Sequence, residues 1–178
     1  RICLPAPFTV DIDHQSGGLC KDFLRPPEIA RVEKSIMRYV KFGNTGLDIS
    51  EIGFGGIPLI RLDKDEAVEV LRRAYDRGIT FYDTANAYRD SEQKMGIAFR
   101  GRRDKIVIAT KTLRRDAKKA AEHLENSLRM LGTDCIDIYQ LHQIAQDRDW
   151  EAISAPGGAY EMAAKALRDG KIRFIGAT

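Results

Sequence analysis

Residues 106–111 read Ile-Val-Ile-Ala-Thr-Lys, a short run rich in β-branched residues that ends in a charged side chain. Such a run is typical of a buried β-strand. Four similar runs begin near Ile52, Thr80, Ile136 and Ile172, so that the five runs follow one another at intervals of 28, 26, 30 and 36 residues. A strand plus the helix that leads to the next parallel strand takes about 30 residues. The chain is therefore predicted to be α/β.

The segments between these runs carry helical patterns. Apolar residues recur three and four positions apart within 67–74, 117–131 and 159–167, and a shorter helix is expected over about 91–99. Before the first run, residues 39–49 hold apolar residues on both sides of a glycine-rich turn, a pattern that predicts a β-hairpin. The sequence thus indicates an N-terminal hairpin, about five strands and four helices.

Composition excludes several classes of protein. The 178 residues are 43% hydrophobic and 31% charged, with a net charge of +3, which is typical of a globular protein rather than a disordered one. No apolar run approaches the roughly 20 residues of a membrane span. Basic residues are interleaved with acidic ones, so no nucleic-acid partner is expected and a small molecule is favoured. The three cysteines show no metal-ligand spacing, and their odd number fits a reducing cytoplasm. No metal site is expected, and the oligomeric state stays open.

Both the doubly wound sheet and the eight-stranded barrel alternate strands with helices. A dinucleotide-binding doubly wound fold should carry a GxGxxG turn after its first strand, and residues 53–56 (GFGG) do not have that spacing. Three successive strands end instead in an ionisable residue, namely Asp83, Lys111 and His142. Since the carboxyl ends of parallel barrel strands converge on one face, we expect these side chains to meet there. This pattern favours the barrel.

The residues at this face suit the reduction of a carbonyl group. Asp83 is the expected partner of the buried Lys111 ammonium, because a buried charge is costly without one. Tyr88 lies five residues beyond Asp83, where the ammonium would favour its phenolate and make it a usable proton donor. His142 could donate a hydrogen bond to the carbonyl oxygen. None of these groups can supply a hydride, so a nicotinamide cofactor is implied.

Five segments in order along the chain resemble successive motifs of the aldo-keto reductase superfamily: 48–56 (DISEIGFGG), 81–88 (FYDTANAY), 108–111 (IATK), 138–142 (IYQLH) and 170–176 (GKIRFIG). The resemblance implies a (β/α)8 barrel whose N-terminal hairpin closes its bottom. It also implies NADPH-dependent reduction of aldehydes or ketones to alcohols. A non-catalytic binding or regulatory subunit on the same fold is the alternative.

The resemblance assigns roles to individual residues. The family's catalytic tetrad matches Asp83, Tyr88, Lys111 and His142, with Tyr88 as the general acid. Cofactor contacts are implied for Asp83, Lys111 and His142. They are also implied for the glycine turn at Gly55 and Gly56, where missing side chains let the nicotinamide approach the backbone, and for the adjacent Ile57. The chain departs from many relatives at the residue after the tyrosine, where Arg89 replaces a glycine, so the shape of this loop is open.

Length suggests that the barrel is incomplete. A (β/α)8 barrel takes about 250 residues, whereas the regular pattern here runs only over 37–178. We therefore expect residues 1–36 to be a leader outside the fold and 37–178 to be the N-terminal part of a barrel truncated at the C-terminus. The family's remaining cofactor residues would follow Thr178, so this fragment alone is expected to be inactive. Residues 155–176 resemble a bacterial branch that often carries an iron–sulphur domain, which would also have to follow Thr178.

Overall fold

The fold was described from a computed structural model, which places residues 37–178. The leader expected over residues 1–36 lies outside the described residues. An antiparallel hairpin is followed by a five-stranded parallel sheet in the order β3-β4-β5-β6-β7. The strands are β1 (Tyr39–Lys41), β2 (Asp48–Ser50), β3 (Phe54–Gly55), β4 (Phe81–Asp83), β5 (Val107–Thr112), β6 (Ile136–Leu141) and β7 (Ile172–Ala177). The α/β prediction and the hairpin are confirmed.

Helices fill the intervals between the strands. The α-helices are α1 (Lys64–Asp76), α2 (Ser91–Ala98), α3 (Ala117–Leu131), α4 (Asp147–Ser154) and α5 (Ala159–Arg168), and the 3₁₀ helices are η2 (Ile57–Arg61) and η3 (Arg103–Lys105). The sequence analysis expected four α-helices within 37–178 and missed α4. No helix in the described part of the chain has both the length and the apolar character needed to cross a membrane.

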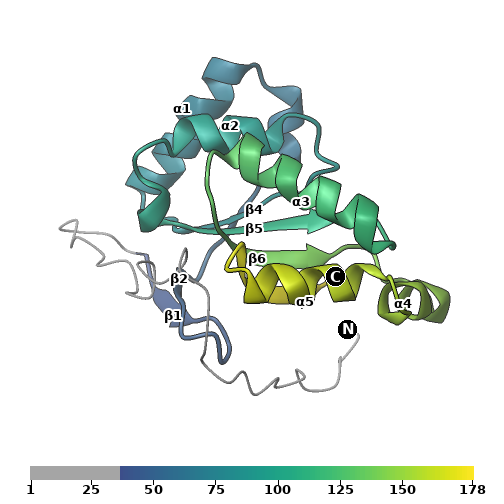
Figure 1. The fold of residues 1–178 in the computed structure, drawn as a ribbon. Helices are drawn as coiled ribbons and strands as arrows, with labels where there is room; N and C mark the ends of the chain where they lie inside the picture. Colours follow the sequence, from purple (N-terminus) through teal and green to yellow (C-terminus); the bar gives the residue numbers. More distant parts are fainter. Residues whose placement is uncertain (1–36) are drawn as a thin grey trace.

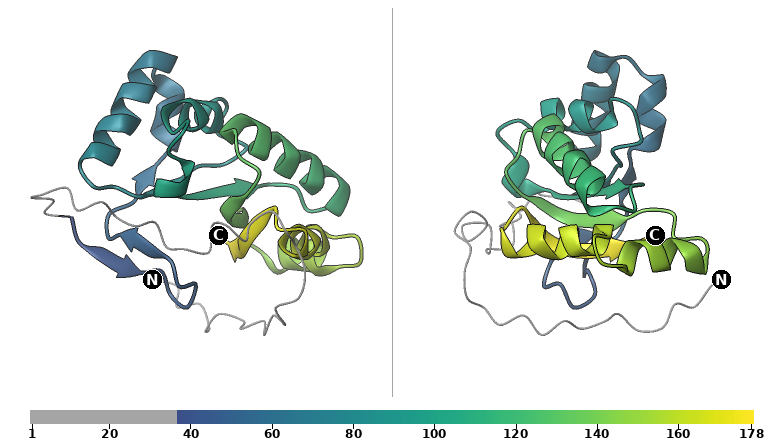
Figure 2. Two further views of the ribbon diagram at one scale, coloured as in Figure 1. Left: turned by 60° about the vertical axis from the view of Figure 1, so that its left-hand side comes forward. Right: turned by 45° about the vertical axis from the view of Figure 1, so that its right-hand side comes forward.

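The sheet separates two apolar layers. On one face, helices α1, α2, α3 and α5 pack their apolar sides against residues such as Ile108, Ile136 and Tyr139. On the other face, Leu47 and Ile49 of the hairpin pack against alternate strand residues, and Figures 1 and 2 show the hairpin on the side of the sheet away from α1, α2 and α3. Because both faces are covered, all six residues of β5 are buried, as expected for a parallel strand.

Local signals set the ends of two helices. Asp63 accepts a hydrogen bond from the backbone N–H of Glu66 at 2.9 Å, and the Glu66 carboxylate accepts one from the N–H of Asp63, which makes a capping box at the start of α1. Asp116 caps α3 through the N–H of Lys119 at 2.9 Å. Gly132 ends α3 with φ of +64°, a conformation that residues with a Cβ seldom adopt.

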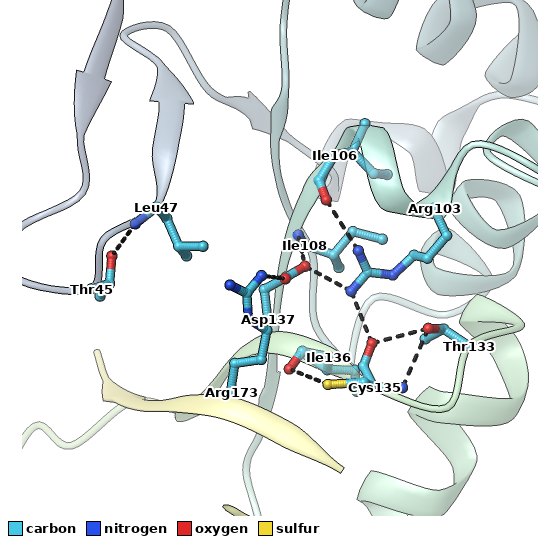
Figure 3. A network of polar contacts seen from close by, with 10 residues as sticks. All are labelled: Thr45, Leu47, Arg103, Ile106, Ile108, Thr133, Cys135, Ile136, Asp137 and Arg173. Carbon is cyan, nitrogen blue, oxygen red and sulfur yellow. Dashed lines mark hydrogen bonds and ion pairs between the residues drawn. The ribbon is translucent and has the colours of Figure 1, made fainter. Parts of the chain in front are cut away.

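One buried carboxylate joins three strands near their amino ends (Figure 3). Asp137, only 3% exposed, accepts hydrogen bonds at 2.7 Å from Arg103 Nη2 and from Arg173 Nη1. It also accepts one at 2.9 Å from the backbone N–H of Ile108, which precedes the first paired residues of the β5–β6 ladder, Ala109 and Ile138. The carboxylate therefore satisfies a strand N–H that the ladder leaves unpaired.

Replacement of Asp137 by alanine should lower the free energy of unfolding by about 3 to 5 kcal/mol, because two arginines and one strand N–H would lose their buried acceptor. Urea denaturation of the wild type and the variant measures this change. Asp48→Ala is the matched control, since Asp48 also pairs with a cation, Lys41, at an exposed site. The control should cost about 1 kcal/mol or less, and equal losses in the two variants would contradict the structural role of Asp137.

Candidate active site

Three of the predicted residues stand at the carboxyl ends of adjacent strands. Asp83 is the last residue of β4, Lys111 lies near the end of β5, and His142 directly follows β6. These strands are neighbours and parallel. The sheet therefore brings the three side chains to one edge, as the sequence analysis expected.

Lys111 forms the expected ion pair. Its Nζ donates to Asp83 Oδ1 at 2.5 Å and to the backbone oxygen of Thr84 at 2.7 Å. The lysine residue is 5% exposed, so these two acceptors replace the water that its ammonium loses on burial. The pair also ties the end of β4 to the end of β5.

Tyr88 faces this ammonium from the loop that follows β4. Lys111 Nζ lies 5.2 Å from the centre of the Tyr88 ring, within the range of a cation–π interaction. Backbone hydrogen bonds hold the loop, from the N–H of Asn86 to the oxygen of Lys111 at 3.1 Å and from the N–H of Tyr88 to the oxygen of Ala85 at 2.9 Å. The tyrosine ring is thus placed beside the ion pair by the main chain.

The backbone of Arg89 shows which shape this loop takes where an arginine replaces the glycine of many relatives. Its φ is +46°, in the left-handed region that glycine adopts without a steric penalty. The chain therefore keeps the backbone conformation that suits glycine although it carries an arginine. The loop retains its turn at the cost of local strain.

His142 completes the group. Its ring centre lies 6.3 Å from that of Tyr88 with the planes 80° apart, and its Nδ1 lies 2.8 Å from Thr178 Oγ1. Burial, the nearby Lys111 ammonium and Arg115 lower the pKa of the imidazole, and Asp83 opposes them. A lowered pKa leaves the ring neutral at neutral pH, so one nitrogen donates and the other accepts.

The two glycines at the end of β3, Gly55 and Gly56, lie in different surroundings. A Cβ on Gly55 would meet nothing within 4 Å, whereas one on Gly56 would lie 2.7 Å from Met95 Cε and 2.8 Å from the backbone oxygen of Asp83. Atoms of this chain therefore fill the space where a Gly56 side chain would lie, and the cofactor contact expected for this turn stays a prediction. Gly55 presents open backbone, beside the 52% exposed Ile57.

Two buried residues that the sequence analysis missed support this edge from α2. Ser91 Oγ donates to the backbone oxygen of Gly56 at 3.0 Å and accepts from Thr84 Oγ1 at 2.8 Å. Glu92, 2% exposed, accepts from Thr110 Oγ1 at 2.6 Å, and burial raises its pKa. Both residues form the first turn of α2, and a serine followed by a glutamate is an ordinary helix start, so nothing in the sequence distinguished them.

Comparisons with known proteins identify a family and relatives of this chain. The sequence profile described as the Aldo/keto reductase family matches residues 51–178. The chain is 38% identical over 160 residues to aldo-keto reductase YhdN of Bacillus subtilis (strain 168), covering 79% of this chain and 46% of that protein. It is 32% identical over 151 residues to L-galactose dehydrogenase of Arabidopsis thaliana, covering 76% and 46%. The chain thus spans about half the length of these curated relatives.

Solved structures show the same relationship. An aldo-keto reductase from Klebsiella pneumoniae in complex with NADPH superposes with a TM-score of 0.67 at 31% identity, covering 80% of this chain and 49% of that one. The holo form of an aldo-keto reductase from Bacillus halodurans gives a TM-score of 0.65 at 30% identity, covering 80% and 50%. The described sheet and helices therefore match about half of a solved chain in each case.

Substitution of Arg89 by glycine should raise the free energy of unfolding by about 0.5 to 1 kcal/mol. Glycine relieves the strain of the left-handed conformation, and this gain exceeds the cost of the greater entropy that glycine gives the unfolded chain. Chemical denaturation measures the change. Arg77→Gly is the matched control, since Arg77 is also exposed but has φ of −92°, and it should bring no gain. Equal effects at both sites would show that Arg89 carries no strain.

Proposed function

Since the chain belongs to the aldo/keto reductase family, we propose that it supplies the catalytic residues of an NADPH-dependent oxidoreductase that reduces aldehydes or ketones to alcohols. The observation that carries the proposal is the meeting of four groups at one edge of the sheet: the Asp83–Lys111 ion pair, the Tyr88 ring over the ammonium, and the neutral His142. Residues 37–178 would form the N-terminal part of a (β/α)8 barrel. The complete tetrad favours an enzyme over a non-catalytic subunit of the same fold.

Tyr88 is the proposed general acid. When the substrate carbon accepts hydride, negative charge develops on the carbonyl oxygen, and a proton delivered from Tyr88 Oη neutralises it. The phenolate left on Tyr88 is stabilised by the Lys111 ammonium, whose position depends on Asp83. In this proposal, the ion pair places a positive charge beside the tyrosine ring.

His142 is the proposed hydrogen-bond donor to the substrate oxygen. Because its ring is neutral at neutral pH, it carries a single N–H. In the proposed tautomer, Nδ1 accepts the hydrogen bond that it shares with Thr178 Oγ1, and the proton stands on Nε2, where it can polarise the carbonyl. A neutral donor has the further advantage that it does not compete with Tyr88 as the proton source.

Bound NADPH would supply the hydride to this site. The open backbone at Gly55 and the exposed Ile57 lie at the carboxyl end of β3, beside the strand that ends in Asp83, and they fit a flat nicotinamide ring. We propose that Gly55, Ile57 and the tetrad residues Asp83, Lys111 and His142 line the nicotinamide end of the cofactor. The NADPH complex of the Klebsiella relative supports this choice of cofactor.

In a polypeptide that contains the complete barrel, Tyr88→Phe should lower kcat about 10²- to 10⁴-fold, since phenylalanine has no proton to donate. NADPH oxidation with 4-nitrobenzaldehyde measures the rate. The affinity for NADPH should stay unchanged, because the ring itself is retained. Tyr160→Phe, at an exposed position on α5, is the control and should keep full activity. A fully active Tyr88→Phe enzyme would remove Tyr88 from the role of general acid.

The 178-residue chain alone should bind NADPH weakly, because it spans only about half the length of its relatives and offers only one side of the proposed cofactor site. Titration of the chain with NADPH, followed by cofactor fluorescence, tests this expectation. A polypeptide with the complete barrel serves as the positive control. Saturable binding by the short chain at micromolar concentration would show that residues 1–178 hold the cofactor without further elements.

A further inference from the structure

Arg115 makes a two-pronged contact with the backbone next to His142. It lies in the loop between β5 and α3, and its Nη1 donates to the oxygen of His142 while its Nη2 donates to the oxygen of Gln143, both at 2.7 Å. The planar guanidinium can bind two neighbouring acceptors at once, and charged donors form the stronger hydrogen bonds. One side chain thus holds two consecutive peptide groups.

These peptide groups need such support. Gln143 has φ of +56°, a left-handed conformation that is unfavourable for a residue with a Cβ. Directly before it, the N–H of His142 donates to the oxygen of Thr112 at 3.0 Å, and directly after it the N–H of Ile144 donates to the oxygen of Thr178 at 2.8 Å. The chain therefore turns sharply at Gln143, and this turn leaves the imidazole at the carboxyl edge of the sheet.

Arg115 is itself held from two further elements. Its guanidinium lies 3.3 Å from Asp149 Oδ1, and Asp149 accepts hydrogen bonds from the N–H groups of Ala145 and Gln146 where α4 begins. The backbone oxygen of Arg115 accepts from the N–H of Ala159 at the start of α5, at 2.7 Å. Contacts on both sides limit the freedom of the side chain, which is 24% exposed.

We propose that Arg115 is a positioning residue for His142. Arg115 holds the turn at Gln143 so that the imidazole of His142 faces Tyr88 and the substrate carbonyl. This role rests on the proposed reductase function, in which His142 binds the carbonyl oxygen. The family resemblance did not assign it, because Arg115 acts on the backbone of the tetrad residue and does not touch the reacting atoms.

The charge of Arg115 has a second effect on the same ring. The charged or titratable groups around His142 are Lys111, Asp83, Tyr88 and Arg115, and Arg115 is one of the two cations that lower the pKa of the imidazole. Loss of this cation should therefore raise the pH at which His142 titrates. Lysine at position 115 would keep the charge but could not hold both carbonyls with a rigid fork.

NMR spectroscopy of the 178-residue chain separates these two effects. In Arg115→Met, the amide of Ile144 should exchange with solvent about tenfold faster or more, because the turn loses two charge-assisted hydrogen bonds, and the His142 Cε1 proton should titrate at higher pH. In Arg115→Lys, the amide should still exchange faster, whereas the titration should stay near that of the wild type. Unchanged exchange of the Ile144 amide in both variants would overturn the proposal.

Arg114→Met is the matched control. Arg114 is the exposed neighbour of Arg115 and donates from Nε to His123 Nε2 at 3.0 Å, and its charge lowers the pKa of His123. This variant should raise the pH at which His123 titrates. It should leave unchanged both the pH at which His142 titrates and the exchange rate of the Ile144 amide. A control that altered His142 as much as Arg115→Met does would also overturn the assignment.

Kinetics in a polypeptide with the complete barrel connects the turn to the reaction. Arg115→Lys should lower kcat at least tenfold while the KM for NADPH changes little, because the carbonyl loses an aligned donor and the cofactor contacts remain. Faster Ile144 exchange with unchanged kcat would refute the positioning role. Absence of any carbonyl reduction by the wild type would instead refute the proposed function. The NMR result would still report whether Arg115 holds the turn at Gln143.

Discussion

The Asp83–Lys111 ion pair is the interaction on which the functional edge of this structure depends. A buried ammonium is stable only with close acceptors, and Lys111 finds them on β4 and the loop that follows it. That requirement fixes the ends of two strands against each other, and the loop that leaves β4 then carries Tyr88 over the ammonium. The Lys111 charge, which the proposed reaction would use, therefore also determines the shape of this edge.

The opposite edge of the sheet is held by a second buried ionic group. Asp137 binds two arginines and a strand N–H near the amino ends of β5, β6 and β7 (Figure 3). Both networks pair charge with charge, but the Asp137 group lies near the amino ends of the strands, whereas Asp83, Lys111 and His142 lie at or just beyond the carboxyl ends. In a parallel sheet, one edge can thus maintain the fold while the other carries the residues proposed for the chemistry.

The sequence alone predicted those features that depend on local pattern. The interval between apolar runs indicated parallel strands, and the charged residue at the end of each run indicated the edge where Asp83, Lys111 and His142 meet. Helix α4 was not predicted because only Ile153 of its residues is buried, so no apolar stripe marks it, and because it begins after Gln146, which is not a usual N-cap residue, with Asp149 capping it from inside. The packing of Gly56 and the contacts of Asp137 could not be predicted, because their partners lie 27 or more residues away in the sequence.

Arg89 shows what a sequence motif records. Where the resemblance leads one to expect a glycine after Tyr88, this chain has Arg89, whose φ of +46° lies in the region that glycine adopts without a steric penalty. A search that requires a glycine at position 89 would therefore discard a segment whose backbone adopts the conformation that glycine favours.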